Sequence, residues 1–158
     1  MATHEVDKPN ETRTITSLKP EGVDEIGKQL RSILADVFAL YLKTKNFHWH
    51  THGSHFRDYD LLLDEQGEEI FAMTDAIAER GRKIGAHALR SISKIPRHQR
   101  LSDNDECAVG PKDMLAELCR DNQQLVIWLG TAHAVCDRFG DLATASLIEI
   151  LPAPAARA

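Results

Sequence analysis

The stretch NFHWHTHGSHFRDYDLLLDEQGEEIFAMTDAIAER, residues 46–80, decides which fold we assign to this chain. It opens with a cluster of four histidines within eight residues: His48, His50, His52 and His55. Gly53 and Ser54 predict a break inside this cluster, between one helix that ends there and another that begins. The second helix then carries acidic residues at regular intervals, so the stretch combines a helix–helix connection with a concentration of potential metal ligands.

Working outward, apolar residues recur at three- and four-residue steps on both sides of the break, as in amphipathic helices. We expect four helices, over about residues 22–50, 57–85, 111–139 and 141–151. Residues 86–95 are a candidate short helix in a long crossover, and the polar segment after them is expected to be a loop. No strand pattern appears in the sequence. The sequence therefore predicts an all-α fold, a four-helix bundle with one long connection.

The composition is consistent with one soluble domain. The chain has 158 residues with 42% hydrophobic and 27% charged residues, which places it among globular proteins rather than disordered ones. We expect three regions: a mobile N-terminal tail 1–20, the bundle 21–151 and a C-terminal tail 152–158. No apolar run is long enough to span a membrane, and no secretory signal is visible. Three cysteines without a pairing pattern indicate a cytoplasmic protein.

Four acidic residues of the second expected helix share one face: Asp60, Asp64, Asp75 and Glu79. At about 100° per residue, they lie at roughly 0°, 40°, 60° and 100° around the helix axis. The rise of about 1.5 Å per residue separates Asp64 from Asp75 by about 16 Å. One chain therefore cannot bring all four carboxylates to one small site.

The four acidic positions are symmetric about a point between residues 69 and 70. An antiparallel copy related by a two-fold axis at that point would place Asp64 opposite the partner's Asp75, and Asp60 opposite the partner's Glu79. The product would be a homodimer with two identical acidic sites, each built from both chains. This isologous arrangement is the commonest geometry of homo-oligomers.

Carboxylates that face each other across an interface repel unless a cation lies between them. Oxygen ligands combined with an imidazole suit divalent iron, manganese or zinc, and His48 is the expected nitrogen ligand. The alternative is that acids at this spacing form an ordinary solvated helix face. The spacing alone leaves both interpretations open.

The same residues carry a resemblance to a known family. NFHWHTHGSHF at 46–56 and DYDLLLDEQGEEIFAMTDAIAER at 58–80 resemble the Dps family of mini-ferritins, and DLATASL at 141–147 is similar to the start of that family's fourth helix. The resemblance covers about residues 20–150. It implies a ferritin-like four-helix bundle with a short extra helix in the long crossover loop, and a homo-oligomeric shell, a dodecamer built from two-fold dimers.

By motif position, the resemblance implies a ferroxidase site between subunits. His48 and Asp64 match the ligands that one chain supplies. Asp75 and Glu79 match the ligands that the partner supplies. Asp60 stands where most members have a second histidine, and Trp49 matches the tryptophan that flanks the site. The predicted catalytic set is His48, Trp49, Asp60, Asp64, Asp75 and Glu79, and all of these except Trp49 are predicted metal ligands.

The implied activity is oxidation of Fe(II) to Fe(III) by hydrogen peroxide or oxygen, with two iron ions at each site. Storage of the ferric mineral in the shell would protect DNA from oxidative damage. Two alternatives stay open: a nucleoid-binding protective shell with little ferroxidase activity, and a metal-binding bundle for zinc or manganese. A net charge of −5 per chain predicts that direct binding to DNA, and so association with the nucleoid, is weak.

Other residues have two interpretations each. Asp137 and Asp141 are candidates for the acidic entry pore that the resemblance implies, or for a solvated turn and a helix N-cap. His50, His52 and His55 could form a second metal site with His48, but we favour loop or interface histidines. Trp49 could relay electrons or simply pack. His133 is expected in the core, and the basic run of Arg80, Arg82 and Lys83 is expected to be solvated.

Overall fold

The computed structural model describes residues 16–53 and 56–152. Its helices are α1 (Pro20–His50), α2 (Phe56–Lys83), α3 (Ile95–His98), α4 (Pro111–Phe139) and α5 (Leu142–Ile150), with a 3-10 turn η1 (Ile92–Lys94) before α3. No strand occurs in this described part of the chain, so the all-α prediction is confirmed. None of the described helices is both long and apolar enough to cross a membrane.

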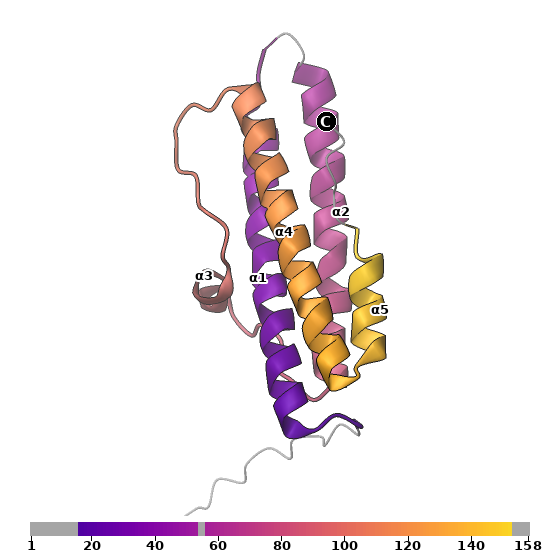
Figure 1. The fold of residues 1–158 in the computed structure, drawn as a ribbon. Helices are drawn as coiled ribbons and strands as arrows, with labels where there is room; N and C mark the ends of the chain where they lie inside the picture. The colour runs from indigo at the N-terminus through magenta and orange to yellow at the C-terminus, as the bar shows by residue number, and fades with distance from the viewer. Residues whose placement is uncertain (1–15, 54–55, 153–158) are drawn as a thin grey trace, which may run out of the picture.

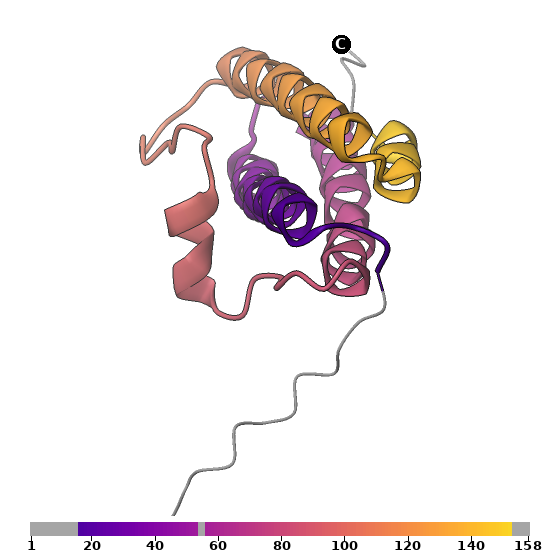
Figure 2. The same ribbon diagram turned by 60° about the horizontal axis from the view of Figure 1, so that its bottom comes forward.

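Helix α1 is the central element of the bundle. It packs along α2 and α4, and the crossover segment that carries α3 passes over its remaining side (Figures 1 and 2). Buried residues therefore recur around most of α1, from Ile26 through Leu40 to Phe47. A helix enclosed in this way fixes the position of the residues at its C-terminal end, where His48 lies.

Helix α5 takes the fourth place in the bundle but runs beside only part of α4 (Figure 1). The connection is short because Gly140 adopts a left-handed conformation (φ 73°), which glycine tolerates, and closes α4 with backbone bonds to Asp137 and Cys136. Asp141 then caps α5, and the helix ends before Leu151 and Pro152. The expected boundaries of this short last helix are confirmed to within one residue.

The crossover differs from the expectation. Residues 86–91 are not helical, and the short helix comes later, as η1 and α3, so that it extends into the segment expected to be a loop. Gly85 has a positive φ of 91° and turns the chain out of α2, and Pro96 favours a helix start at Ile95. Tails were expected at residues 1–20 and 152–158. Of these, residues 1–15 and 153–158 lie outside the described part of the chain.

Two buried ionic clusters hold the crossover against the bundle. In the first, Asp36 of α1 is fully buried and accepts bonds from the backbone nitrogen (2.6 Å) and the guanidinium (2.6 and 3.0 Å) of Arg100. The guanidinium also lies over the ring of Trp128 at 4.1 Å. Burial raises the pKa of the Asp36 carboxyl above its ordinary value, and the bonds from Arg100 offset only part of that rise.

In the second cluster, Lys43 of α1 is buried and its ammonium has three oxygen partners. These are Asp121 at 2.7 Å, Glu117 at 2.8 Å and the carbonyl oxygen of Ser102 at 2.5 Å. Burial acts to lower the pKa of Lys43, but the two carboxylates outweigh it and the pKa is raised. The cluster therefore ties α1, α4 and the crossover to one another.

A stability prediction follows from the close approach of α1 to the start of the crossover. A Cβ atom on Gly27 would lie 2.5 Å from the Cβ atom of Ala86, closer than packed atoms allow. Gly27→Ala should lower the free energy of unfolding by about 1–3 kcal/mol. Gly130→Ala is the control, because nothing lies near its Cβ position in α4, and it should raise stability by about 0.5–1 kcal/mol. Urea denaturation of both variants measures the difference, and equal effects would contradict the packing argument.

The Lys43 cluster predicts a pH dependence. The folded-state pKa of Lys43 is raised above 10.5, so its contribution is present below that pH and is lost on further alkalinisation. The pKa of Glu117 is lowered below 4.5: burial opposes this shift, but bonds from Lys43 and Asn104 outweigh it. The contribution of Glu117 is therefore present above pH 4.5 and is lost as pH falls through the folded-state pKa.

Lys43→Met should therefore destabilise the protein by about 3 kcal/mol across roughly pH 5–10. The difference from wild type should shrink as the pH falls through the lowered folded-state pKa of Glu117, because that carboxyl is then neutral and no longer pairs with Lys43. Urea denaturation at a series of pH values measures it. A difference that grows on acidification would contradict the assignment.

Candidate metal centre

His48 lies in the last turn of α1, and its ring faces α2. The Nδ1 atom lies 3.0 Å from the carbonyl oxygen of Asp60 and 3.2 Å from the Oδ1 atom of the same residue. A carbonyl oxygen only accepts hydrogen bonds, so Nδ1 of the neutral ring carries the proton and donates it. The ring's lone pair is then on Nε2, the nitrogen that remains available to a metal ion.

Asp64 of α2 faces this available nitrogen. Its Oδ1 atom lies 3.8 Å from Nε2 of His48. Metal ions such as zinc bind nitrogen and oxygen ligands at about 2.0–2.2 Å, so two atoms that share one ion stand roughly 3–4 Å apart. His48 and Asp64 are therefore spaced to share one divalent ion.

Asp64 also forms an ion pair with Lys45, a residue that the sequence pattern did not single out. The ammonium of Lys45 lies 2.5 Å from Oδ1 of Asp64, and its side chain is only 17% exposed. The hydrogen bond from Lys45 holds the pKa of the Asp64 carboxyl below its ordinary value, against a smaller opposing effect of desolvation. One feature of the sequence could have indicated this ion pair: Lys45 lies three residues before His48, so the two side chains are neighbours on the surface of α1.

Asp60 lies beside His48, but on the other edge of the ring from Asp64. Both its carbonyl and its carboxylate approach Nδ1, whereas Asp64 approaches Nε2. In this arrangement Asp60 fixes the tautomer and the orientation of the imidazole, as outer partners of metal-bound histidines do. The ligand role expected for its carboxylate stays a prediction.

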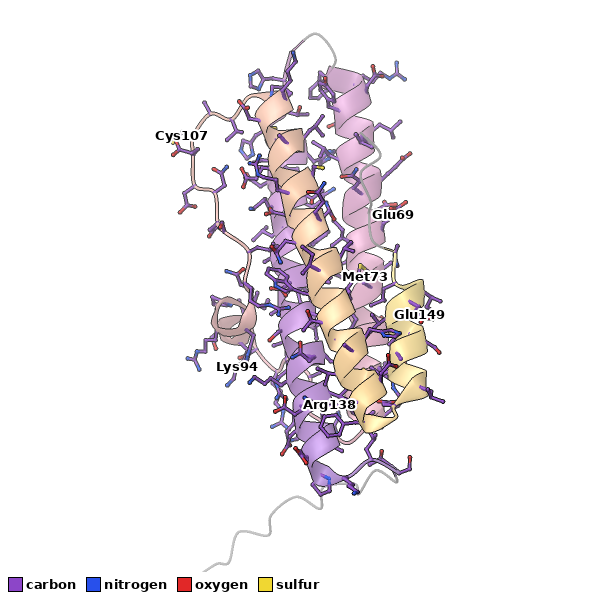
Figure 3. All side chains as sticks on the ribbon, viewed as in Figure 1. Glu69, Met73, Lys94, Cys107, Arg138 and Glu149 are labelled. Carbon is purple, nitrogen blue, oxygen red and sulfur yellow. The ribbon has the colours of Figure 1, made fainter. Side chains whose placement is uncertain are left out.

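Asp75 and Glu79 lie farther along α2, and both are exposed. Because α2 is unbroken, the separation of about 16 Å between Asp64 and Asp75 holds in the structure. Glu79 is 68% exposed and has Lys83 at 3.6 Å. Glu69 projects from α2 on the side away from α1 (Figure 3). Within residues 16–53 and 56–152, no group of three or more His, Cys, Asp or Glu side chains could hold a metal ion. One chain thus presents two separate halves of the predicted site.

Large apolar side chains are exposed around these halves. Trp49 is 61% exposed next to His48, and Leu42, Leu61 and Phe71 are about half exposed or more. The Phe71 ring packs against Tyr41 of α1, with 5.0 Å between centroids. Such a surface in a globular protein is typical of an interaction site.

A groove of about 710 Å³ lies between α1 and the crossover, and Trp49 forms part of its lining. Its lining is mostly apolar and includes Tyr41, Leu42, Ile92 and Ile95. The groove therefore continues the apolar surface from α2 across α1 to the short helix α3.

The other histidines of the cluster do not converge on the site. Nδ1 of His50 contacts the carbonyl oxygen of Asn46 at 2.7 Å, and Nδ1 of His52 contacts the carbonyl oxygen of His50 at 3.2 Å. His55 lies outside the described residues. The two described rings thus contact nearby backbone, His50 from the last residue of α1 and His52 from the connection that follows it.

Asp141 is the N-cap of α5, as the second interpretation of this residue held. One carboxylate oxygen accepts a bond from the Thr144 backbone and pairs with Arg80 at 2.7 Å, and the other accepts the Thr144 hydroxyl. Arg80 is therefore not solvated, and that expectation was wrong. Its place on α2, three residues after the buried Ile77, was the available signal. The pore role stays a prediction for both aspartates.

His133 is not a core residue, contrary to the expectation. It is half-buried on the surface between α4 and α5, where Nδ1 lies 3.2 Å from Asp137 and Nε2 lies 2.9 Å from Glu149. Glu149, labelled in Figure 3, reaches it from α5. A histidine one turn before an aspartate on the same helix face was the signal for such a pair.

The chain is similar to known proteins in sequence and in fold. The ferritin-like domain family model matches residues 27–151. Antigen TpF1 of Treponema pallidum is 30% identical over 123 residues, which cover 78% of this chain and 70% of that protein. DNA protection during starvation protein 1 of Deinococcus radiodurans is 28% identical over 130 residues, 82% of this chain and 63% of that one. The structure of Dps from Thermosynechococcus elongatus superposes with a TM-score of 0.80 at 26% identity and covers 83% of each chain.

The two interpretations of Asp141 predict different stability effects. Asp141→Ala removes the cap of α5 and leaves Arg80 without its carboxylate, so we expect a loss of about 2–4 kcal/mol. Asp137→Ala removes only an exposed pair with His133 and should change stability by about 0.5 kcal/mol or less. Thermal and urea denaturation measure both. A small effect of Asp141→Ala would show that its contacts are not structural.

Proposed function

The chain belongs to the ferritin-like domain family and, within it, to the Dps group, and from this premise we propose that it oxidises Fe(II) and stores the Fe(III) product. The observation that carries the proposal is the approach of Nε2 of His48 to Oδ1 of Asp64, 3.8 Å apart, on a face of α2 that also holds Asp75 and Glu79. This donor set, rich in carboxylates with one imidazole, suits ferrous iron. Iron is the substrate and the cargo in this proposal.

A two-fold dimer would complete the site. The acidic positions of α2 are symmetric about a point between residues 69 and 70. An antiparallel copy therefore brings the partner's Asp75 next to Asp64 of the first chain, and the partner's Asp64 next to Asp75 of the first chain. The apolar surface formed by Leu42, Trp49 and Phe71 supports an interface at this place. Each dimer then holds two sites, and twelve chains assembled from such dimers would enclose a store for the mineral.

The proposed reaction takes two electrons from two ferrous ions. Two Fe(II), one hydrogen peroxide and two protons give two Fe(III) and two water molecules, with cleavage of the O–O bond. Because both electrons reach the same peroxide, a free hydroxyl radical is not released. Oxygen is the other oxidant that we propose for this site.

The residues of the chain would position the iron rather than carry out the redox chemistry. Nε2 of His48 supplies a neutral donor, and the Asp60 carbonyl keeps the proton on Nδ1 so that this donor stays available. Asp64, with the partner's Asp75 and Glu79, supplies negative charge that offsets the growing charge of oxidised iron. Trp49 lies beside the site and would exclude water from it once the interface forms.

Removal of ferrous iron and peroxide would protect DNA chemically. Relatives that are named for DNA protection during starvation support this role. A net charge of −5 per chain favours it over coating of the DNA backbone by direct contact.

A second candidate function is binding of zinc or manganese without oxidation. The observation that favours it is the number of carboxylates, four for each histidine once Asp60 is included, which also suits manganese. Metal binding without ferric absorbance after addition of peroxide would identify this function.

Mixed assemblies test the proposed site. Asp64→Asn and Glu79→Gln should each abolish the rapid absorbance increase when peroxide is added to anaerobic Fe(II)-loaded protein. The two variant chains, unfolded together and refolded in equal amounts, form heterodimers in which one site is doubly altered and the other is intact. About a quarter of all sites should then be active again if dimers form at random.

His48→Ala mixed with Asp64→Asn is the control. Both changes lie in the half-site that one chain supplies, so no mixed dimer contains an intact site and no activity should return. Light scattering of each sample establishes that assemblies of the same mass are compared. Absence of recovery for the first mixture, or recovery for the second, would contradict a site shared between chains.

A further inference from the structure

The ammonium of Lys45 forms a hydrogen bond with the carboxylate oxygen of Asp64 that a metal ion at this site would need as a ligand. The ammonium lies 2.5 Å from Oδ1 of Asp64, and the same Oδ1 is the atom that faces Nε2 of His48. A charge-assisted hydrogen bond to this oxygen occupies a lone pair that the oxygen could otherwise donate to a metal ion. The half-site therefore already contains a cation, and that cation belongs to the protein.

The lysine is held in this position by its surroundings. Its stem crosses α2 at Gly67, where an added Cβ atom would lie 3.0 Å from Cδ of Lys45. A glycine in the middle of a helix costs about 0.5–1 kcal/mol relative to alanine, so this position gives up helix stability where the stem passes. The side chain is mostly buried against α2, which distinguishes it from a surface lysine that samples many rotamers.

The positive charge of Lys45 also offsets part of the negative charge of the proposed site. A complete site would contain Asp60, Asp64 and the partner's Asp75 and Glu79, hence four negative charges around one imidazole. Without metal these charges repel one another. One ammonium per complete site, supplied by Lys45, reduces that repulsion while the site is empty.

We infer that Lys45 is a built-in competitor for divalent metal: its ammonium neutralises Asp64 in the empty site and must leave Oδ1 when an ion binds between Asp64 and His48. This inference rests on the proposed function and adds a means of regulating the same site. A competing internal cation lowers the affinity for every ion that uses Asp64. Weak, exchangeable binding suits an ion that is a substrate and must move on to a store, rather than a permanently bound cofactor.

Cobalt(II) binding tests the inference, because Co²⁺ occupies ferrous sites and is not oxidised by air. Isothermal titration and the visible absorbance of bound Co²⁺ are measured for wild type and for Lys45→Met, which keeps the stem over Gly67 and removes the charge. We expect Lys45→Met to bind Co²⁺ roughly tenfold more tightly or better, the factor that one charge-assisted hydrogen bond represents. A lysine with only a structural role would give weaker binding or none.

Three further variants make the outcomes distinct. Lys45→Arg keeps the charge and should bind like wild type, and Lys28→Met removes an exposed lysine of α1 roughly 25 Å away along the helix and should also change nothing. Asp64→Asn should lose the site. If Lys45→Met loses helical circular dichroism, Lys45→Gln carries the same expectation.

Unchanged or weaker binding by Lys45→Met, together with loss of binding by Asp64→Asn, would overturn the role of Lys45 and leave the proposed site intact. Unchanged binding by Asp64→Asn would overturn the proposed site, and the inference with it.

Discussion

The fixed rise of an unbroken helix governs how this chain presents its acidic residues. Helix α2 runs from Phe56 to Lys83 without interruption, so Asp64 and Asp75 share a face but stay about 16 Å apart. No side-chain movement closes that distance. The donors of one chain therefore remain in two halves, and an antiparallel second copy is the arrangement that joins them. The exposed apolar residues beside both halves agree with this requirement.

Two lysines of α1, only two residues apart, illustrate how burial separates a structural ion pair from an exchangeable one. Lys43 is buried between Asp121 and Glu117 and also bonds to the crossover backbone, so its charge is fully compensated within the chain. Lys45 points to α2 and has one carboxylate, Asp64, which is itself nearly half exposed. A divalent ion can replace the ammonium at Asp64. The carboxylates that hold Lys43 are less exposed, at 18% for Glu117 and 13% for Asp121, and the lysine side chain itself is only 6% exposed.

Hydrogen peroxide, the proposed oxidant, also oxidises cysteine thiolates, so the reactivity of the thiols in this chain matters. Burial, together with the nearby Asp141 and Asp137, raises the pKa of Cys136 to about 12. The thiolate is the form that reacts with oxidants, so this thiol is almost entirely unreactive near neutral pH. Cys107, by contrast, is exposed in the crossover, far from α2 (Figure 3). Burial thus protects Cys136 from the proposed oxidant, whereas Cys107 is open to solvent.

The sequence by itself determined the helical architecture and the acidic face of α2, because helical period, proline and glycine act over a few neighbouring residues. It also pointed to Asp64, since i, i+4 spacing fixes which side chains of α2 share a face, and to His48 by its place at the end of the preceding helix. It misplaced the short helix, where local signals are weak, and it missed Lys45, Arg80 and the clusters of Asp36 and Lys43. These contacts join residues far apart in the chain and depend on how each helix is rotated against its neighbour. Only the tertiary structure decided that the Asp60 carbonyl fixes the His48 tautomer and that a lysine already occupies Asp64, because both follow from the distance between α1 and α2.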